Sequence, residues 1–328
     1  GELYRVIQIG APPDRIIFSG VGKRRDEIRY ALEAEILFLS VESSADLNLI
    51  ASVAAETGRR ARVVFRTNPN IDAHTHPYIS TGLQQHKFGI ALSDAEELFR
   101  VARGMADIDV VGVGCHIGSQ ITELAPFEDA IASITRFTAR LLDDGFQLKY
   151  IDFGGGLGIP YNGEEPPLPH EYAETVIRSV EKLGLTLVLE PGRVIVGNAG
   201  ILLSRVLLRK RQGGKQFVVV DAGMNDLIRP ALYGSFHRLV PVCPRANREV
   251  VDVVGPICES SDFIAKDREM ERLEADDLIA VMSAGAYGFS LSSNYNSRTR
   301  AAEVLVDRDT FTIVRRRETY EDLIRPEL

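Results

Sequence analysis

The sequence predicts an α/β fold in the first part of the chain and an all-β fold in the second. In the first part, short apolar segments alternate with amphipathic segments, which is the βα repeat of a parallel sheet or barrel. After Arg193 this helical periodicity gives way to strand-like segments, punctuated by turns such as Gln212-Gly213-Gly214. We therefore expect a barrel domain over residues 1–195 and a β domain over residues 196–328.

Six apolar runs of strand length define the predicted sheet of the first part. They are Ile16–Ser19, Ile36–Ser40, Arg62–Arg66, Val110–His116, Tyr150–Phe153 and Thr186–Leu189. Predicted helices between them include Ser43–Glu56, Ser93–Arg103 and Pro126–Asp143. In the second of these helices, Ser93 and Glu96 have the spacing of a capping box. The second part contributes the strand candidates Ile201–Arg209, Gln216–Asp221, Val250–Val254, Leu278–Val281, Ala301–Val306 and Phe311–Arg315.

A complete (β/α)8 barrel of the TIM type needs two more units than these strands supply. Such a barrel takes ~250 residues for its eight units, so two units correspond to roughly 60 residues. The segment Gly1–Gln8 already reads as the beginning of a helix ahead of the first candidate strand. We therefore expect the barrel domain to be incomplete at its N-terminus, and the barrel of the numbered chain to be open.

The composition limits the classes of function. The chain has 328 residues, 45% of them hydrophobic, with a formal net charge of -8, which argues against nucleic-acid binding. Its three cysteines, Cys115, Cys243 and Cys258, have no CxxC spacing, so a disulfide framework or zinc cluster is not expected and a reducing cytosol fits. No apolar run approaches the ~18 residues of a membrane span. We interpret His74-Thr75-His76 as a loop and expect no metal.

Polar or glycine-rich loops follow five of the six predicted strands, and the carboxyl ends of barrel strands carry the active site. These loops are Ser19-Gly20, Arg66-Thr67-Asn68, His116–Ser119, Gly154–Gly158 and Glu190–Arg193. Successive glycines let backbone N–H groups converge on an anion. A carboxylate at a strand end, such as Glu190, can accept a proton from a pyridine nitrogen, and Arg193 can bind phosphate or carboxylate.

Each of these loops also has an ordinary structural interpretation. The glycine run could be a tight turn, Glu190 and Arg193 an ion pair that closes the barrel, and His116 a structural hydrogen-bonding residue. The occurrence of such groups after three consecutive strands favours a site that holds a phosphate-bearing cofactor. Pyridoxal phosphate fits best, because its pyridine nitrogen suits the carboxylate.

The second part contains three further motifs of interest. In Gly255–Asp262, Cys258 precedes Glu259, a combination that makes no zinc site; a buried, purely apolar cysteine is the alternative. Ala284–Gly288 places Tyr287 on a tight turn between glycines. In Asn225–Tyr233, Arg229 and Tyr233 stand four residues apart. For the last two motifs, ordinary packing or surface roles are the alternative.

In this order, the motifs resemble those of the barrel-type pyridoxal-phosphate decarboxylases of the alanine-racemase fold, and within them the diaminopimelate decarboxylases. The resemblance runs from end to end of the chain. Its carriers are His116–Ser119, Gly154–Gly158, Glu190–Arg193, Arg229 to Tyr233, Gly255–Asp262 and Ala284–Gly288, with Lys87-Phe88-Gly89 and Gly1-Glu2-Leu3. It implies decarboxylation of meso-2,6-diaminopimelate to L-lysine and CO2, the last step of lysine biosynthesis.

The resemblance also implies roles at the cofactor. His116 would stack on the ring of pyridoxal 5'-phosphate, and Glu190 would bond the pyridinium nitrogen and keep it protonated. The phosphate would be held with the help of Ser119, Gly154, Gly155 and Gly156. Gly192, Arg193 and Tyr287 would contact the cofactor as well.

The substrate-binding roles follow from the same resemblance. Arg193, Arg229 and Tyr233 would hold the distal carboxylate, Tyr287 would contact the substrate, and Glu259 would recognise its distal ammonium. Cys258 would protonate the carbon that loses CO2. In this family Cys258 and Glu259 reach the site from the partner subunit, so the resemblance implies a homodimer with shared active sites and a cytoplasmic enzyme.

One departure from the family pattern leaves alternatives open. The family's Schiff-base lysine lies in a Tyr-x-x-Lys-Ala-Asn setting on the first barrel strand, and no such motif occurs here; Lys23 and Lys87 match other family positions. A catalytically inactive regulatory homologue is therefore one alternative, against which the intact Cys258 and Glu190 argue. An ornithine, arginine or carboxynorspermidine decarboxylase is the other. Glu259 favours diaminopimelate, because the ornithine type typically has Asp after the cysteine.

Overall fold

A computed structural model describes residues 1–71 and 87–327 of the chain. The chain divides into two compact units. The first unit comprises Gly1–Gly158 and Pro166–Pro191, and the second comprises Ile159–Glu165 and Gly192–Leu328. Within the described residues, no helix is long and apolar enough to span a membrane.

The first unit is built on a parallel sheet in the order β1-β2-β3-β5-β6-β7, with β4 paired to β3. Its strands are β1 (Ile17–Phe18), β2 (Phe38–Val41), β3 (Ala61–Asn68), β4 (Ile90–Ala91), β5 (Ile108–Gly114), β6 (Tyr150–Asp152) and β7 (Thr186–Val188). All six predicted strands are confirmed, and only the two-residue β4 was not predicted. Because β1 and β7 stand at opposite ends of the strand order, the sheet is an open half-barrel, as expected.

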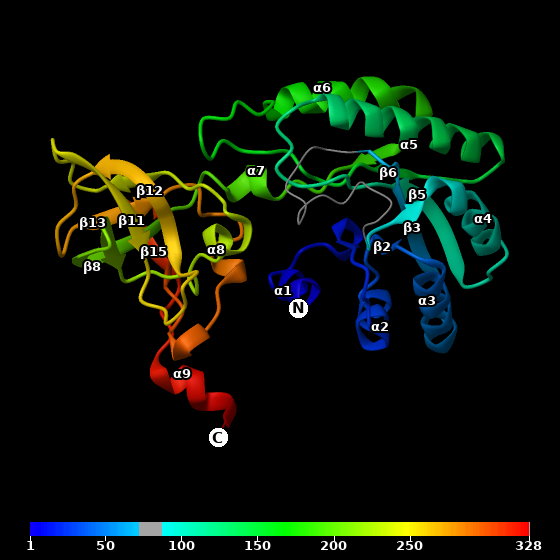
Figure 1. Cartoon of the computed structure of the whole chain (residues 1–328). Coiled ribbons are helices and arrows are strands. Elements are labelled where there is room, and N and C mark those ends of the chain that lie inside the picture. Colours follow the sequence, from blue (N-terminus) through cyan, green and yellow to red (C-terminus); the bar gives the residue numbers. More distant parts are fainter. Residues whose placement is uncertain (72–86, 328) are drawn as a thin grey trace. The chain divides into compact units, whose positions relative to one another are not determined.

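Helices connect the strands of this sheet (Figure 1). They are α1 (Glu2–Gln8), α2 (Arg25–Glu33), α3 (Ser44–Thr57), α4 (Leu92–Arg103), α5 (Ala125–Asp143) and α6 (Pro169–Val180). The side chain of Ser43 caps α3 by accepting the Asp46 N–H at 3.0 Å. The capping box predicted for Ser93 and Glu96 is wrong. Helix α4 begins one residue earlier, so Ser93 lies inside it and donates to Asp94 instead.

An aromatic cluster forms part of the core of the first unit. Phe99 of α4 lies 4.5 Å from Phe65 of β3 and 5.4 Å from Phe146, measured between ring centroids. Phe137 of α5 meets the same ring edge-on at 5.9 Å. Phe65, Phe99 and Phe137 are at most 1% exposed, so these rings fix α4 and α5 against the sheet.

The second unit contains a six-stranded sheet in the order β10-β13-β8-β9-β11-β12 and a separate two-stranded sheet, β14-β15. The strands are β8 (Leu202–Gln212), β9 (Lys215–Val220), β10 (Leu239–Pro241), β11 (Arg248–Val254), β12 (Phe263–Glu271), β13 (Leu278–Val281), β14 (Glu303–Asp307) and β15 (Thr310–Arg315). Short helices α7 (Arg193–Val196), α8 (Arg229–Tyr233) and α9 (Tyr320–Ile324) accompany them. The predicted strands are confirmed, whereas β10 and β12 were missed.

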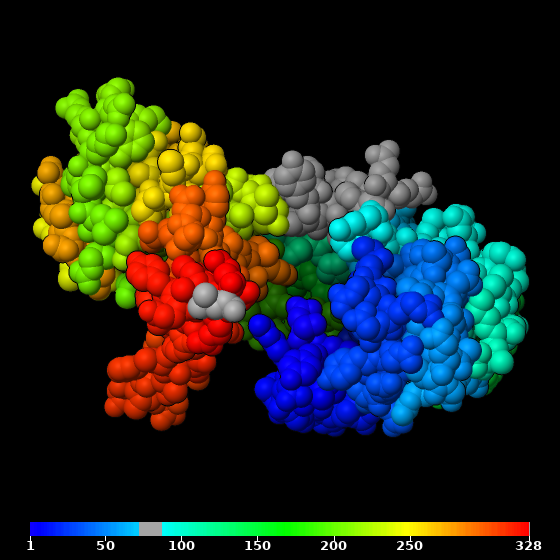
Figure 2. Space-filling view, turned by 90° about the horizontal axis from the view of Figure 1, so that it is seen from below, coloured from blue at the N-terminus to red at the C-terminus, as the bar shows by residue number. Residues whose placement is uncertain are grey.

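The β14-β15 hairpin protrudes from the surface of the second unit (Figure 2). Its apolar side chains are largely exposed, among them Val306 at 67% and Phe311 at 73%. The six-stranded sheet, by contrast, encloses a continuous apolar core that includes Val206, Val253 and Ile279. The hairpin therefore presents apolar surface that this chain does not itself cover.

Candidate active site

A cavity of about 140 Å³ lies at the carboxyl ends of the strands of the first unit. Its lining comes from the residues that follow or end these strands: Ser19, Ser40, Arg66, Gly114, Cys115, His116, Asp152, Gly155 and Glu190. The structure thus places the predicted cofactor residues His116, Gly155 and Glu190 on one cavity. It adds Arg66 and Asp152, to which the sequence interpretation gave no role.

The glycine loop after β6 is in direct contact with the neighbouring strand ends. A Cβ atom on Gly155 would lie 2.2 Å from the carbonyl oxygen of Glu190, and one on Gly156 would lie 2.4 Å from that of Gly118. Gly154 has a φ of +62°, in the left-handed region that favours glycine. No side chain therefore fits at these positions, and the loop lets the ends of β5, β6 and β7 approach one another.

Two N–H groups of the glycine loop hold side chains of the cavity. Gly154 donates to Asp152 Oδ1 at 2.8 Å, and Gly155 donates to His116 Nδ1 at 3.1 Å. The sequence predicts that this loop binds a phosphate. Its first two N–H groups are instead bonded to Asp152 and His116, and phosphate contact by Gly154–Gly156 stays a prediction.

The side chains of Asp152 and Glu190 form an acid pair on this cavity. Asp152 is 5% exposed, and its pKa is raised well above the ordinary range by burial and then by the nearby Glu190 carboxylate. Arg66 acts in the opposite direction. Such a pair favours a cationic N–H group beside it, and a protonated pyridine nitrogen is such a group.

His116 is a neutral imidazole in this setting. Burial, and then the positive charge of Arg66, lowers its pKa to about 4. Because Nδ1 accepts the Gly155 N–H, the ring proton of the neutral form resides on Nε2. A neutral ring fixed by a backbone donor is suited to stacking on a planar aromatic group.

A buried ion pair holds Arg66 at the cavity. Glu42 accepts from Arg66 Nη1 at 3.0 Å, and the two side chains are 2% and 13% exposed. The same carboxylate also accepts the N–H groups of Gly20 and Gly89, each at 3.1 Å. Glu42 therefore connects the loop after β1, the end of β3 and the segment before β4. The sequence interpretation missed it, although it follows β2 directly.

The two lysines that follow strands of the first unit differ in surroundings. Lys23 Nζ donates to the Gly20 carbonyl at 2.7 Å and to Asp46 at 2.9 Å, and its side chain is 1% exposed. Its ammonium is therefore committed to a structural ion pair. Lys87 is exposed, with its ammonium 5.1 Å from the centre of the Phe88 ring.

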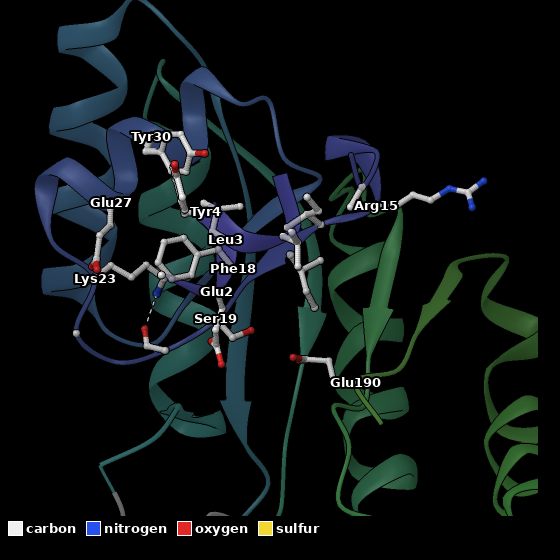
Figure 3. A pocket seen from close by; sticks show the side chains of 17 residues that line it. Glu2, Leu3, Tyr4, Arg15, Phe18, Ser19, Lys23, Glu27, Tyr30 and Glu190 are labelled. Atoms are coloured by element: carbon white, nitrogen blue, oxygen red, sulfur yellow. Dashed lines mark hydrogen bonds between the residues drawn. The ribbon is translucent and has the colours of Figure 1, made fainter. Parts of the chain in front are cut away.

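A larger cavity of about 690 Å³ lies beside β1, at the edge of the half-barrel (Figure 3). Apart from Glu190, all of its lining residues belong to the first 30 of the chain. The side chain of Glu190 extends from the end of β7 toward this space. Glu190 thus lines this cavity as well as the smaller one at the strand ends.

The second unit gathers two arginines around one tyrosine. Arg193 Nη1 donates to the hydroxyl of Tyr161 at 2.7 Å, and the Arg229 guanidinium lies 4.5 Å from the centre of the same ring. Arg193 and Arg229 are 6% and 5% exposed. Tyr287 is 4.8 Å from the Arg193 guanidinium and adopts a φ of +58°, a strained conformation often seen at functional sites.

The remaining predicted residues of the second unit lie nearby or in an exposed loop. Tyr233 closes α8, one turn after Arg229, and its phenol interacts electrostatically with that guanidinium. Cys258 and Glu259 are both exposed, so the interpretation of Cys258 as a buried apolar residue is wrong. Their partners are Asn296, which accepts the Cys258 N–H at 2.9 Å, and Tyr295, which donates to Glu259 at 3.2 Å.

No cluster of three or more metal-ligating side chains occurs in the part of the chain that the structure describes. His74-Thr75-His76, interpreted above as a loop, lies outside the described residues.

Comparison with known proteins identifies the family. Residues 1–197 match the family "Pyridoxal-dependent decarboxylase, pyridoxal binding domain". The chain is 51% identical to the diaminopimelate decarboxylase of Pseudomonas aeruginosa, covering 98% of this chain and 78% of that protein. For the Aquifex aeolicus enzyme, the identity is 44% over 100% of this chain and 79% of the other.

A solved structure gives the same result. The Helicobacter pylori diaminopimelate decarboxylase, crystallised in complex with L-lysine, superimposes with a TM-score of 0.96 at 44% identity, covering 100% of this chain and 82% of that one. This chain belongs to the diaminopimelate decarboxylase family. The family's fold is a TIM-type barrel followed by a β domain, and its cofactor is pyridoxal phosphate.

The residues of the first unit fit the ring end of that cofactor. The acid pair of Asp152 and Glu190 matches a pyridinium N–H, and the neutral His116 matches the face of the ring. The backbone contacts of the glycine loop leave no room for a side chain that would intrude on this arrangement.

Proposed function

We propose that this chain decarboxylates meso-2,6-diaminopimelate to L-lysine and CO2 with pyridoxal phosphate as cofactor, in lysine biosynthesis. The choice of substrate rests on one observation, the pair of buried guanidiniums of Arg193 and Arg229. Two adjacent buried cations suit a carboxylate, and diaminopimelate carries one at the end remote from the reacting carbon. Ornithine has no carboxylate at its remote end.

In this proposal the first unit supports the cofactor. When bound, the cofactor supplies an electron sink for the carbon–carboxylate bond that breaks. Glu190 keeps the pyridine nitrogen protonated, Asp152 supports the charge of Glu190, and His116 packs against the ring. Ser119 and the Gly154–Gly156 loop contribute to phosphate binding, and Gly192 contributes to cofactor binding from the second unit.

The second unit recognises the substrate. Arg193 and Arg229 bind the distal carboxylate with the help of Tyr233, while Tyr287 contacts substrate and cofactor. Glu259 binds the distal ammonium, and the Cys258 thiol donates a proton to the carbon that has lost CO2. Selectivity follows because a substrate without the second amino-acid end leaves buried polar groups unpaired.

We propose that Cys258 and Glu259 act in the active site of a second copy of the chain, so that the enzyme is a homodimer. Both residues are exposed in the single chain, and so is the apolar β14-β15 hairpin, with Leu305 60% and Phe311 73% exposed. Large apolar side chains in such numbers on one element are typical of an interaction surface.

A complementation experiment tests this assembly. Glu190→Ala and Cys258→Ala should each be nearly inactive alone. Mixed and allowed to exchange subunits, they should regain up to about a quarter of wild-type activity, because one site of each mixed dimer then carries neither substitution. A monomer by analytical ultracentrifugation, or no recovery after proven exchange, contradicts shared sites.

The substrate assignment is tested by CO2 release. The full-length protein, loaded with pyridoxal phosphate, is assayed with meso-diaminopimelate, ornithine, arginine and carboxynorspermidine. We expect kcat/KM for diaminopimelate to exceed the others by at least about 100-fold, the discrimination that a site with buried polar groups provides. Equal or better turnover of ornithine would refute the assignment.

We also propose a cytoplasmic location. Cys115, Cys243 and Cys258 are free thiols, as a reducing compartment favours. Fractionation of the source cells, with the protein followed by antibody, tests this proposal; recovery with the periplasm or the membranes argues against it.

A further inference from the structure

We infer that His237 and Tyr161 are positioning residues that fix the guanidiniums of Arg229 and Arg193 as a clamp for one carboxylate. This inference rests on the proposed function, because the carboxylate is the one at the distal end of the substrate. The carboxylate clamp is defined here as these four residues. All of them belong to the second unit and are at most 9% exposed.

Hydrogen bonding fixes the protonation of His237. Its Nδ1 lies 2.8 Å from the carbonyl oxygen of Met282, which can only accept, so Nδ1 carries the proton. Its Nε2 lies 2.9 Å from Arg229 Nη1, which can only donate. A neutral His237 with an unprotonated Nε2 satisfies both contacts, and therefore acts as the acceptor that orients Arg229.

The charges around His237 keep it in that form. Burial leaves it 0% exposed, and Arg229, Arg193 and Arg268 all surround it with positive charge. The Met282 carbonyl acts in the opposite direction, and the pKa is lowered to about 4. The ring of Tyr161 also packs against that of His237. At neutral pH, Nε2 is therefore available as an acceptor.

Tyr161 offsets the repulsion between the two buried guanidiniums of Arg193 and Arg229. Burial lowers the pKa of Arg229, and the charge of Arg193 acts in the same direction. The Tyr161 ring faces Arg229 at 4.5 Å and Arg193 at 5.7 Å, and its hydroxyl accepts from Arg193. The negative face of an aromatic ring attracts both cations. One phenol thus holds the pair together until a carboxylate neutralises it.

The two positioning residues also fix each other. The rings of Tyr161 and His237 meet edge to face, with centroids 5.2 Å apart and planes inclined at 77°. Tyr161 comes from the segment Ile159–Glu165, and His237 lies just before β10. The clamp is therefore set before substrate arrives, which lowers the entropy cost of binding the carboxylate.

The test compares two ligands that differ by this carboxylate. L-lysine, the product, retains the distal carboxylate, and pentane-1,5-diamine lacks it. Their dissociation constants are measured by calorimetry on the full-length protein loaded with pyridoxal phosphate. The variants are His237→Phe, which keeps an aromatic ring, His237→Gln, which restores an acceptor, and Tyr161→Phe, which removes only the hydroxyl. Ser204→Ala, a buried hydroxyl elsewhere in the second unit, is the control.

We expect His237→Phe to weaken L-lysine binding by about tenfold or more, because a buried guanidinium loses its acceptor. The affinity for the diamine should change by less than about twofold, and His237→Gln should recover most of the loss. Tyr161→Phe should weaken L-lysine about fivefold, the effect of one lost hydrogen bond. Ser204→Ala should leave both affinities unchanged.

Each contrary result has a distinct meaning. Equal weakening of both ligands assigns His237 and Tyr161 to the fold alone and overturns the inference, as does unchanged L-lysine affinity in folded variants. If His237→Phe fails to fold, His237→Gln and Tyr161→Phe decide the question by the same ratio of affinities. A wild-type protein that binds both ligands equally overturns the proposed substrate as well, whereas loss of the variant effect alone leaves that substrate standing.

Discussion

The two units of this chain carry opposite charges at their functional residues. In the first unit, Asp152 and Glu190 place two carboxyl groups on one cavity, and burial, followed by the Glu190 carboxylate, raises the pKa of Asp152. In the second, Arg193 and Arg229 crowd two guanidiniums around Tyr161. Each pair is unfavourable alone and is relieved by a group of opposite charge. The comparison teaches that one unit suits a pyridinium and the other a carboxylate.

Each unit also uses a neutral histidine, with the same pKa and a different purpose. His116 and His237 both have pKa values lowered to about 4, by burial first. His116 accepts the Gly155 N–H at Nδ1, which fixes the orientation of its ring. His237 accepts from Arg229, so its ring orients the Arg229 guanidinium. In the proposed function, His116 contacts the cofactor, whereas His237 orients a residue that binds the substrate.

The largest expected effect tests the acid pair of the first unit. Glu190→Gln removes the charge that would keep the pyridine nitrogen protonated, so kcat for meso-diaminopimelate should fall by about 100- to 1000-fold. Glu174→Gln, the same chemical change on exposed α6, should leave kcat within about twofold. Steady-state CO2 release measures both. If Glu190→Gln retained more than a tenth of wild-type kcat, the charge of Glu190 would not be needed for catalysis, and the proposed role of the acid pair would be wrong.

The next effect tests whether the arginine pair binds only the substrate and not the cofactor. Arg229→Met replaces a buried cation by an apolar chain, so KM for meso-diaminopimelate should rise by about 30- to 100-fold, as for loss of a charged hydrogen-bonding partner. The affinity for pyridoxal phosphate, measured by equilibrium dialysis, should stay within about threefold. A large loss of cofactor affinity with little change in KM would contradict the proposal that the second unit binds the substrate and the first unit binds the cofactor.

A variant of the first unit tests whether that unit binds the cofactor and not the distal end of the substrate. Glu42→Gln leaves Arg66 without its buried counter-charge, and Arg66 lines the cavity with His116 and Glu190. Cofactor affinity should fall by about tenfold, on the scale of one unsatisfied charged partner. The L-lysine affinity of the cofactor-loaded protein should stay within about twofold. Glu56→Gln, in the exposed ion pair with Arg29, is the matched control; equal effects of the two variants contradict a role for Glu42.

The strands of the half-barrel could be predicted because they read as apolar runs, and β2, β3 and β5 are largely buried. The missed strand β12 shows the limit of that signal. Its sequence contains Lys266-Asp267-Arg268-Glu269, because part of the strand is exposed, and its apolar content is too low for the pattern. The short β10 has only three residues and carries no periodicity. Local pattern therefore fails where a strand is short or only partly covered.

The candidate site divides in the same way. His116 and Glu190 could be found because they follow strands and belong to recognisable motifs. The ion pair of Glu42 and Arg66 joins residues 24 positions apart. The contact of Tyr161 with Arg193 spans 32. No sequence pattern predicts such long-range contacts, so the residues that position others emerge only from the fold.

The smallest expected effect is a pH dependence of stability that comes from His237 of the second unit. The folded pKa of His237 lies near 4, below the ordinary 6.5, so between these values the unfolded chain binds a proton that the folded chain does not. Stability therefore falls as the pH drops through this window, by about 1 kcal/mol from pH 7 to pH 5.5 for this one group. Urea unfolding at the two pH values measures it.

The variant that isolates this term is His237→Gln, because glutamine does not titrate. Its loss of stability between the two pH values should be smaller than that of the wild type by about 1 kcal/mol. His170→Gln, the same change at an exposed position of α6, should behave as wild type. The raised pKa of Asp152 acts in the opposite direction and is common to all three proteins, so it cancels in the difference. If His237→Gln kept the full wild-type dependence, the pKa of His237 would not be lowered in the folded protein, and the surroundings proposed to keep its Nε2 an acceptor for Arg229 would be wrong.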